Sequence, residues 1–471
     1  MKRITRRDFL RAGLVTSGAL LLNACGGDAG APSTGPSDVP AELDLPFEVA
    51  PDAINPLGME TPVTAEGVFF SGGYGHDYIQ FAADLFAGLH PGSEVTVEPI
   101  QGVAEKLRPR FVGGNPPDVI DNSGAGNLDF GALVAEGQLM DLAPLMSAAA
   151  LDTPGATVAE TLFPKSQDNL MINGVQYGLN VTYSVAGIWY SSTLFGDRGW
   201  TYPKTWGEML DLCETIKSAG IAPWTYQGKY PGYMIFGLLE PMIYKKGGLQ
   251  PMIDIDNLVD GAWGHPAVVE SLNEMYQLVE NGYIMEGTEG LNHTESQAEW
   301  LQGKAAFIPC GLWLENEMKD MVPDNFNMVI GQAPGDKDAA RAEGGEPFIV
   351  PSKAKHPTAG MEYLRCIISK ESAKYFAVNV SAMMPVVGGT EGVTVSTAVQ
   401  SAVEMVEQVG DDVFPGLRYG GWYSDLSNEA TAMMGEMLTG RITPEQFVEN
   451  VQAMADQVKA DPEVTKFTRE G

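Results

Sequence analysis

Polar side chains that follow predicted strands are the first candidates for ligand chemistry. Asp121 and Asn122 come directly after a short apolar run, and Tyr74 and His76 lie in a glycine-rich loop after another. Carboxylates and planar amides form paired hydrogen bonds with neighbouring hydroxyls, so these residue types suit a polyhydroxylated ligand such as a sugar. For Asp121 the alternative is a turn-forming role without a ligand.

Aromatic side chains supply the other half of that chemistry, because a sugar ring has an apolar C–H face that an aromatic ring can cover. The chain has 8 Trp and 16 Tyr, many of them in predicted loops. Trp224, Tyr226 and Gln227 lie in a loop after a helix, where they are either wall residues of a binding site or part of the core. Four other tryptophans lie within predicted elements and are expected in the core: Trp189, Trp206, Trp263 and Trp300.

No catalytic or cofactor motif in the sequence is complete. The five histidines form no H-E-x-x-H pattern, and Ser123 lacks the preceding glycine of a nucleophile elbow. Neither a P-loop nor a full dinucleotide fingerprint is present. We therefore predict no metal, no cofactor and no catalysis. The acidic cluster Asp254, Asp256, Asn257 and Asp260 lacks the pattern of an EF-hand loop and is interpreted as a solvated turn.

The elements that must position these residues alternate between strands and helices. Short apolar runs at Gly67–Ser71, Glu94–Ile100 and Asp118–Asp121 are separated by helical patterns. This β-α-β-α-β order predicts an α/β fold with a parallel sheet covered on both faces. Ligands of such sheets gather at the carboxyl ends of the strands, which are residues 71–76 and 121–127 here.

Two later helices have clear start signals, and the cysteines lie in apolar surroundings. Thr205 with Glu208, and Thr443 with Gln446, have the spacing of capping boxes. Apart from Cys25, the cysteines are interpreted as buried free thiols, with one disulfide as the alternative. They are Cys213, Cys310 and Cys366.

The first 24 residues are typical of an export signal. A basic stretch that includes Arg6 and Arg7 precedes an apolar stretch too short to span a bilayer. Residues 5–10 resemble a twin-arginine motif, with general secretion as the alternative. Leu22–Cys25 resembles a bacterial lipobox, so we expect lipid on Cys25 and a membrane anchor on the extracytoplasmic face of the cell.

The charge of the chain excludes some partners. The formal net charge is −32, and removal of residues 1–24 would make it more negative. Such a chain repels nucleic acid and anionic lipid headgroups, so we expect neither as a partner.

Short motifs also follow one another in a specific order. They are Phe70–Gly75, Asn115–Val119, Gly187–Tyr190, Pro203–Trp206, Gly303–Ala306, Gly311–Trp313 and Tyr419–Tyr423. Behind a lipobox, this order resembles the extracellular solute-binding proteins of carbohydrate ABC importers, over nearly all of the chain from residue 62. Gly72–Tyr78 and Leu107–Ala125 are most similar to the actinobacterial N-acetylglucosamine/diacetylchitobiose-binding lipoproteins.

The resemblance implies a two-lobe, periplasmic-binding-protein-like fold of type II, similar to maltose-binding protein. Three crossovers between the lobes are expected near Asn180–Tyr183, Glu346–Val350 and Val378–Ser381. The implied domains are a signal peptide at 1–24, a lipid-anchored flexible linker at 25–61, an N-terminal lobe at 62–180 and 347–378, and a C-terminal lobe at 184–345 and 381–471.

The resemblance also assigns roles to aromatic residues. Trp313 and Trp422, the latter with Tyr423, match positions that stack on sugar in the family, and a core position is the alternative for each tryptophan. Glu315 and Asn316 follow Trp313 and either reach hydroxyls or cap a helix. A further residue, Tyr183, contacts ligand or serves only as hinge packing.

The function implied is capture of a sugar, N-acetylglucosamine or a chito-oligosaccharide, by a monomer that delivers it to the permease subunits of an ABC importer. A secreted glycoside hydrolase is the main alternative, because its two catalytic carboxylates would also lie among aromatic residues. A structural surface lipoprotein without a small ligand is the third.

Overall fold

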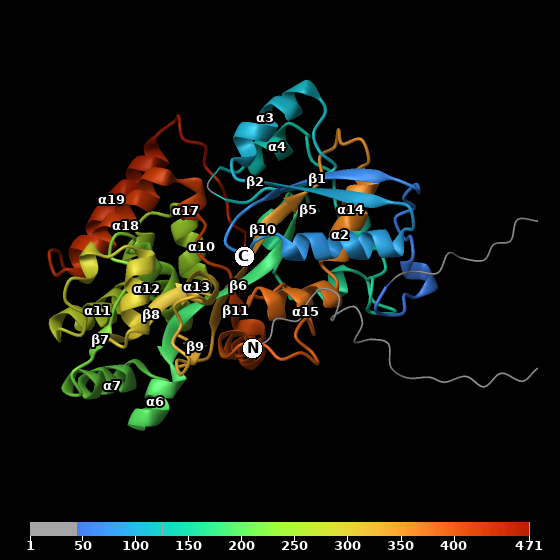
Figure 1. Cartoon of the computed structure of the whole chain (residues 1–471). Helices are drawn as coiled ribbons and strands as arrows, with labels where there is room; N and C mark the ends of the chain where they lie inside the picture. Colours follow the sequence, from blue (N-terminus) through green and yellow to red (C-terminus); the bar gives the residue numbers. More distant parts are fainter. Residues whose placement is uncertain (1–44, 125, 471) are drawn as a thin grey trace, which may run out of the picture.

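The computed structural model describes residues 45–124 and 126–470 and consists of two α/β lobes. In Figure 1 one lobe contains the blue and cyan elements, and the other contains the green, yellow and red elements. The predicted α/β fold with two lobes is thereby confirmed. The predicted signal peptide, Cys25 and the linker up to residue 44 lie outside the described residues.

The N-terminal lobe begins with the predicted β-α-β-α-β unit. β1 (Thr64–Phe70) pairs in parallel with β2 (Glu94–Ile100) and β3 (Val119–Asp121). Alternate side chains enter two different cores, because successive residues of a strand point to opposite faces. Phe69 packs with α2 (Asp77–Leu89), whereas Val68 packs with α3 (Val103–Gly113). The other elements of the lobe are α4 (Phe130–Ala135), α5 (Ala143–Ser147), β4 (Met171–Ile172), β5 (Val175–Gln176), α14 (Pro357–Ile367) and α15 (Lys370–Asn379).

Two long strands connect the lobes. β6 (Leu179–Ser191) and β10 (Ala340–Ile349) pair in antiparallel orientation. Their pairing keeps the same register on both sides of Glu346, whose φ of 49° is left-handed, so the crossing has a local backbone irregularity without an extra residue in β10. The third connection follows α15 and includes Ser381, with a φ of 56°. The predicted crossovers at Asn180–Tyr183 and Glu346–Val350 lie on β6 and at the end of β10, whereas the third crossing lies beyond the predicted Val378–Ser381.

The C-terminal lobe continues the same sheet. There β6 pairs with β8 (Ala305–Gly311) and β9 (Met328–Gly331), and β8 pairs with β7 (Ala222–Trp224). With β11 (Val413–Phe414) beside β10, the sheet has nine strands and a main path β2-β1-β3-β10-β6-β8-β7. The helices of this lobe are α6 (Ser192–Arg198), α7 (Trp206–Ser218), α8 (Gly232–Met234), a π-helical turn (Ile235–Leu239), α9 (Glu240–Gly247), α10 (Gln250–Asp256), α11 (Pro266–Glu280), α12 (His293–Leu301), α13 (Trp313–Met318), α16 (Thr397–Val409), α17 (Tyr419–Trp422), α18 (Ser424–Leu438) and α19 (Pro444–Ala460). Short 3-10 turns precede β6 at Pro51–Ala53, Ala159–Thr161 and Asp168–Leu170, and follow it at Ala262–Gly264, Thr288–Gly290 and Gly410–Asp412.

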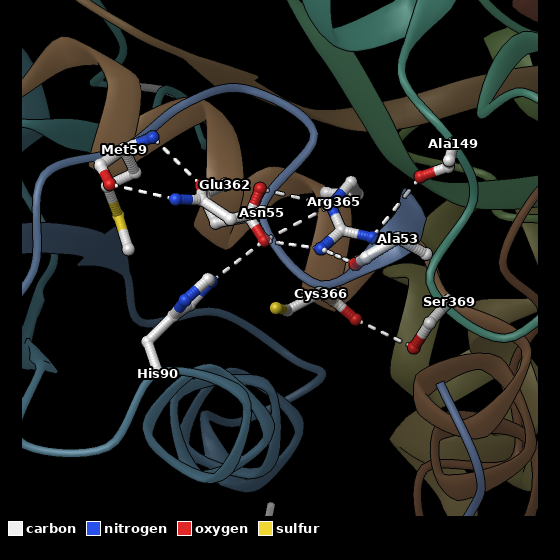
Figure 2. Close-up of polar contacts among 9 residues, drawn as sticks. All are labelled: Ala53, Asn55, Met59, His90, Ala149, Glu362, Arg365, Cys366 and Ser369. Atoms are coloured by element: carbon white, nitrogen blue, oxygen red, sulfur yellow. Dashed lines mark hydrogen bonds and ion pairs between the residues drawn. The ribbon is translucent and has the colours of Figure 1, made fainter. Parts of the chain in front are cut away.

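The segment before β1 is folded against the N-terminal lobe, contrary to the predicted flexible linker up to residue 61. Within it, Met59 is buried in the core that includes α2 and α14. Arg365 on α14 donates to the carbonyl oxygen of Ala53 at 2.9 Å and pairs with buried Glu362, which also contacts His90 (Figure 2). The composition of this segment does not reveal its contacts with the N-terminal lobe, because the partners lie on helices far away in the sequence.

A second domain boundary also differs from the prediction. Residues from 381 onward are predicted in the C-terminal lobe, but Met384 and Val386 belong to the N-terminal core. The backbone N–H of Phe163 donates to the carbonyl oxygen of Pro385 at 2.9 Å, which fixes this stretch to the first lobe. The chain therefore enters the C-terminal lobe for the last time after this stretch and before α16.

Local predictions about helix starts and cysteines are confirmed. Thr205 and Thr443 each form a capping box with the third residue of the helix. All three cysteines of the described chain are free and buried: Cys213, Cys310 and Cys366. Among residues 45–124 and 126–470, no helix combines the length and the apolar character needed to cross a membrane.

Candidate functional site

The loop after β1 and helix α13 bring predicted site residues of the two lobes together. On α13, the side-chain amide of Asn316 donates to the carbonyl oxygen of Gly73. The neighbouring Tyr74 has a raised pKa, first because it is buried and then because the carboxylates of Glu346 and Glu317 lie nearby. Glu346 comes from the crossover strand β10 and Glu317 from α13, so Tyr74 lies where the two lobes meet.

Trp313 presents an aromatic ring at the start of α13. Its ring packs on Gly311, where a Cβ atom would come within 2.0 Å of the indole. Tyr233 and Phe236 lie beside it, with ring centroids 6.3 Å and 5.9 Å from that of Trp313. All three rings are partly exposed. They form an aromatic wall on the C-terminal lobe, which we define as Trp313, Tyr233 and Phe236.

Asp121 is a fully buried carboxyl at the end of β3. Its Oδ1 accepts a hydrogen bond from the hydroxyl of Ser123, and its Oδ2 makes no hydrogen bond of good geometry within the described chain. The carboxyl of Glu346 nevertheless lies close enough for a hydrogen bond between the two acids to affect the pKa of both. The pKa of Asp121 is raised well above its ordinary value, first by burial and then by the nearby carboxylate of Glu346. Burial also raises the pKa of Glu346. Two acids in one buried environment do not both ionise readily, so the pKa of each carboxyl is raised.

Asn122 has a structural role that its position in the sequence did not reveal. Its side-chain amide donates to the carbonyl oxygen of Leu128 at 3.0 Å and accepts from the N–H of Leu128 at 2.8 Å. Because the side chain is fully buried and both of its polar atoms are engaged, it holds the loop after β3. The prediction that Asn122 contacts ligand is corrected accordingly.

The predicted wall residues after α7 belong to the core. Trp224 lies on β7, 1% exposed, and packs against Phe307 at 5.3 Å between centroids. Tyr226 is 2% exposed in the same core. Gln227 is fully buried and donates to the carbonyl oxygen of Pro309 at 2.9 Å. Trp224 Nε1 and Gln227 Oε1 make no hydrogen bond of good geometry within the described chain. Because all three side chains are buried next to β8, their position favours the core role of the two sequence interpretations.

Trp422 and Tyr423 lie at the end of α17 and differ in exposure. Trp422 is partly exposed and packs at the edge of the C-terminal core. Tyr423 is 3% exposed, and its hydroxyl accepts from the N–H of Phe467 at 3.0 Å. A ligand therefore has access to Trp422, whereas Tyr423 is committed to packing within the lobe.

The remaining predicted residues are spread around this junction. Glu315 accepts from the hydroxyl of Ser396 at 2.6 Å, which ties α13 to the start of α16. Tyr183 is 2% exposed and packs against Phe163 at 5.2 Å, so its role is that of hinge packing on β6. His76 is exposed at the start of α2, where it makes no side-chain cap.

Several residues at the junction were missed in the sequence. No sequence motif marks Glu346, although its place before Pro347 in a predicted crossover could have indicated a residue at the junction. Arg341 on β10 forms an ion pair with Glu240 at 2.5 Å and lies 5.4 Å from the ring centroid of Phe236. Periodicity could not identify Arg341 or Phe236, because their importance comes from neighbours more than 100 residues away in the sequence.

Two surface hollows lie away from this junction. One, of about 300 Å³, is lined by α5 and the β4–β5 hairpin, and another, of about 490 Å³, by residues 100–106. Neither contains a predicted site residue. Over residues 45–124 and 126–470, no group of three or more His, Cys, Asp or Glu side chains is arranged to hold a metal ion.

Two α/β lobes, joined by three crossings and in contact where Asn316 of α13 meets the loop after β1, define a class of ligand-binding proteins. Residues 72–374 match the family model described as bacterial extracellular solute-binding protein. The chain belongs to this family, which consists of extracytoplasmic binding proteins. This finding confirms that the chain is not an enzyme and overturns the glycoside hydrolase alternative.

Relatives within the family bind different solutes. The chain is 34% identical over 476 residues to the diacetylchitobiose binding protein NgcE of Streptomyces coelicolor, with 98% of each chain covered. A maltooligosaccharide ABC transporter solute-binding lipoprotein of Streptococcus pneumoniae is 25% identical over 377 residues, which are 77% of this chain and 76% of that protein.

Solved structures confirm the two-lobe fold. A chitin oligosaccharide binding protein superposes with a TM-score of 0.65 at 19% identity, over 85% of this chain and 100% of that one. The apo form of RafE from Streptococcus pneumoniae gives a TM-score of 0.68 at 18% identity, over 84% and 98%. At these identities the likeness concerns the fold alone.

Proposed function

We propose that this protein is the sugar receptor of an ABC importer and that its ligand is a chitobiose-class oligosaccharide of N-acetylglucosamine. The observation that carries the proposal is the 34% identity to a diacetylchitobiose binding protein over 98% of both chains. Sugar specificity changes readily on a shared scaffold, so the site must support the proposal as well.

The chemistry at the junction suits a neutral sugar. The aromatic wall offers partly exposed rings for the C–H face of a sugar ring. On the other lobe, Asp121 has a carboxyl oxygen that makes no hydrogen bond of good geometry among the described residues. A carboxyl that keeps its proton donates to hydroxyl or amide oxygens, and a chito-oligosaccharide has both.

Delivery to an importer follows from a ligand that contacts both lobes. Such a ligand stabilises the arrangement in which the lobes are together, by its difference in affinity for the two arrangements. The permease subunits then distinguish the loaded receptor from the empty one by its shape. We propose that the receptor works as a monomer held at the membrane by lipid on Cys25.

Calorimetric titration of the purified protein tests the ligand. N-acetylglucosamine, diacetylchitobiose and longer chitin oligosaccharides form the test set, and malto- and xylo-oligosaccharides are the controls. We expect the tightest binding in the chitin series, with the sugar recovered intact after hours of incubation. Tight binding of a maltose or xylose series instead would reject the proposed ligand class and retain the receptor.

The anchor requires a separate experiment. Cys25→Ser should move the folded protein from the membrane fraction to the soluble fraction, because no lipid can then be attached. Replacing Arg6 and Arg7 by Lys should block export through the twin-arginine route. A Cys25→Ser protein that stays with membranes through a high-salt wash would disprove the anchor, and unchanged export of the Lys variant would indicate general secretion.

A further inference from the structure

The segment after α19, residues 461–470, turns back along the C-terminal lobe. In Figure 1 its red trace runs from α19 past α17 towards α10. The side chain of Arg469 is buried in this segment and pairs with Asp256 of α10 at 2.6 Å. Its backbone N–H donates to the side chain of Asn257 at 2.6 Å. This segment, which we call the return segment, is therefore anchored firmly to the lobe.

Asp256 links this anchor to α17. It is fully buried and accepts from the backbone N–H groups of Arg418 and Tyr419, each at 2.8 Å, where α17 starts. The interpretation of residues 254–260 as a solvated turn is wrong for Asp256. A buried ion pair adds little net stability in general, because desolvation offsets the attraction. The geometry that Arg469 and Asp256 impose on α17 and the return segment is the better explanation for burying them.

The return segment presents an exposed aromatic ring next to a predicted site residue. Phe467 is 42% exposed and stacks on Trp422, with 5.4 Å between ring centroids and 24° between ring planes. The backbone N–H of Phe467 donates to the hydroxyl of Tyr423 at 3.0 Å. An exposed aromatic ring whose position is fixed on two sides has a face on which an apolar ring of a ligand can stack.

A chain of contacts connects this ring pair with the aromatic wall. The loop before α17 approaches β10 so closely that a Cβ atom on Gly416 would lie 2.1 Å from the guanidinium of Arg341. That guanidinium lies 5.4 Å from the ring centroid of Phe236, which is itself 5.9 Å from the ring of Trp313. These contacts, which pass through the mostly buried Arg341, link the two aromatic groups within the C-terminal lobe.

The loop before α17 also faces the other lobe. Burial is the main reason that the pKa of Arg418 is lowered, and Asp168 of the N-terminal lobe and Glu343 of the crossover strand act in the opposite direction. The contact of Gly416 with Arg341 places the same loop against β10, the strand that crosses between the lobes.

We propose that Phe467, backed by Trp422 and positioned by the Arg469–Asp256 pair, stacks on a second ring of the oligosaccharide while Trp313 stacks on the first. Phe467 contacts ligand in this arrangement, and Arg469 is a positioning residue. The proposal rests on the proposed function, since it requires that the ligand be a sugar with more than one ring. In this arrangement the platform that Phe467 and Trp422 form selects for chain length, because only a ligand with more than one ring contacts both Trp313 and Phe467.

Titration of Phe467→Ala with two ligands tests this selection. We expect the affinity for diacetylchitobiose or a longer chitin oligosaccharide to fall about tenfold, equivalent to about 1.4 kcal/mol, and that for N-acetylglucosamine to change less than about twofold. Phe467→Tyr keeps a ring of the same shape and should restore the affinity. Val259→Ala removes another exposed apolar side chain, 42% exposed on a surface turn, and serves as the matched control.

The positioning role of Arg469 is tested in the same titration. Arg469→Ala should reproduce the selective loss for the longer ligand and should also quench or shift the tryptophan fluorescence change that ligand causes. Arg469→Lys, which can still pair with Asp256, should recover part of both signals. A merely structural role would lower the affinity for both ligands in proportion to the fraction unfolded.

Each outcome has a defined meaning. If the wild type binds no sugar in the panel, the proposed function itself fails. If the wild type binds chitin oligosaccharides and Phe467→Ala binds all of them equally well, the platform is overturned alone. An equal loss for N-acetylglucosamine and the longer ligands also overturns it, because the selection by chain length would be absent.

Discussion

The two lobes contribute to their junction in different ways. The N-terminal lobe contributes Asp121, a buried carboxyl with one oxygen that makes no hydrogen bond of good geometry within the described residues, and next to it Asn122, whose amide is fully engaged by Leu128. The C-terminal lobe contributes partly exposed rings, such as Trp313. A polar residue is available to a ligand only where its hydrogen bonds are incomplete, whereas an aromatic residue is available wherever a ring face is exposed.

A pair of tryptophans on the C-terminal lobe gives the largest expected effects. Trp300 is fully buried, so Trp300→Ala should lower the free energy of unfolding by ~3–5 kcal/mol. Trp313→Ala should leave the unliganded melting temperature nearly unchanged and weaken sugar binding by about thirtyfold, equivalent to ~2 kcal/mol. Thermal melts and calorimetry measure the two quantities. A strongly destabilised Trp313→Ala protein would show that this ring belongs to the core.

Asp121 and Asn122, which are neighbours on the N-terminal lobe, test the contribution of polar residues to the junction. Asp121→Ala should weaken sugar binding by about tenfold and abolish the ligand-induced compaction seen by small-angle scattering. Asn122→Ala leaves the backbone groups of Leu128 without their buried partner and should cost ~1–3 kcal/mol of stability. Its folded fraction should bind sugar normally. Full compaction of Asp121→Ala with sugar would make Asp121 a turn residue.

Gly311 tests whether the position of the Trp313 ring matters as well as its presence. In Gly311→Ala the new Cβ atom would lie 2.0 Å from the indole, so the ring must move. We expect sugar affinity to fall severalfold, less than for Trp313→Ala, with a cost of ~1–3 kcal/mol from overpacking. Gly421→Ala, in open space on α17, is the matched control. Unchanged affinity in Gly311→Ala would contradict a fixed ring position.

The pH dependence of stability is the smallest expected effect. Because the pKa of Asp121 is raised above its ordinary 3.8, the folded protein holds a proton that the unfolded chain has already released. The contribution of Asp121 to stability is therefore present below about pH 4 and is lost as pH rises through its folded pKa. Asp121→Asn should flatten the fall in melting temperature between pH 4 and pH 7. Parallel curves for the two proteins would mean that Asp121 ionises normally.

The sequence by itself determined features that depend on neighbouring residues. Strand alternation and helix periodicity predicted β1 to β3 with α2 and α3 correctly, and the spacing of Thr205 and Glu208 predicted a capping box that the structure contains. These patterns can be recognised in the sequence because their physical causes act over a few residues. The causes are the period of a strand and the free N–H groups at the start of a helix.

Only the tertiary structure decided which polar and aromatic residues are available at the junction. Asn122 and Trp224 had suitable types and loop-like positions, but Leu128 engages the amide of Asn122 and Trp224 is buried against Phe307. Phe467 carried no signal at all, because it is positioned through Arg469 by a carboxylate 213 residues away in the sequence. Burial and hydrogen-bond satisfaction depend on such distant partners, and a local pattern contains no information about them.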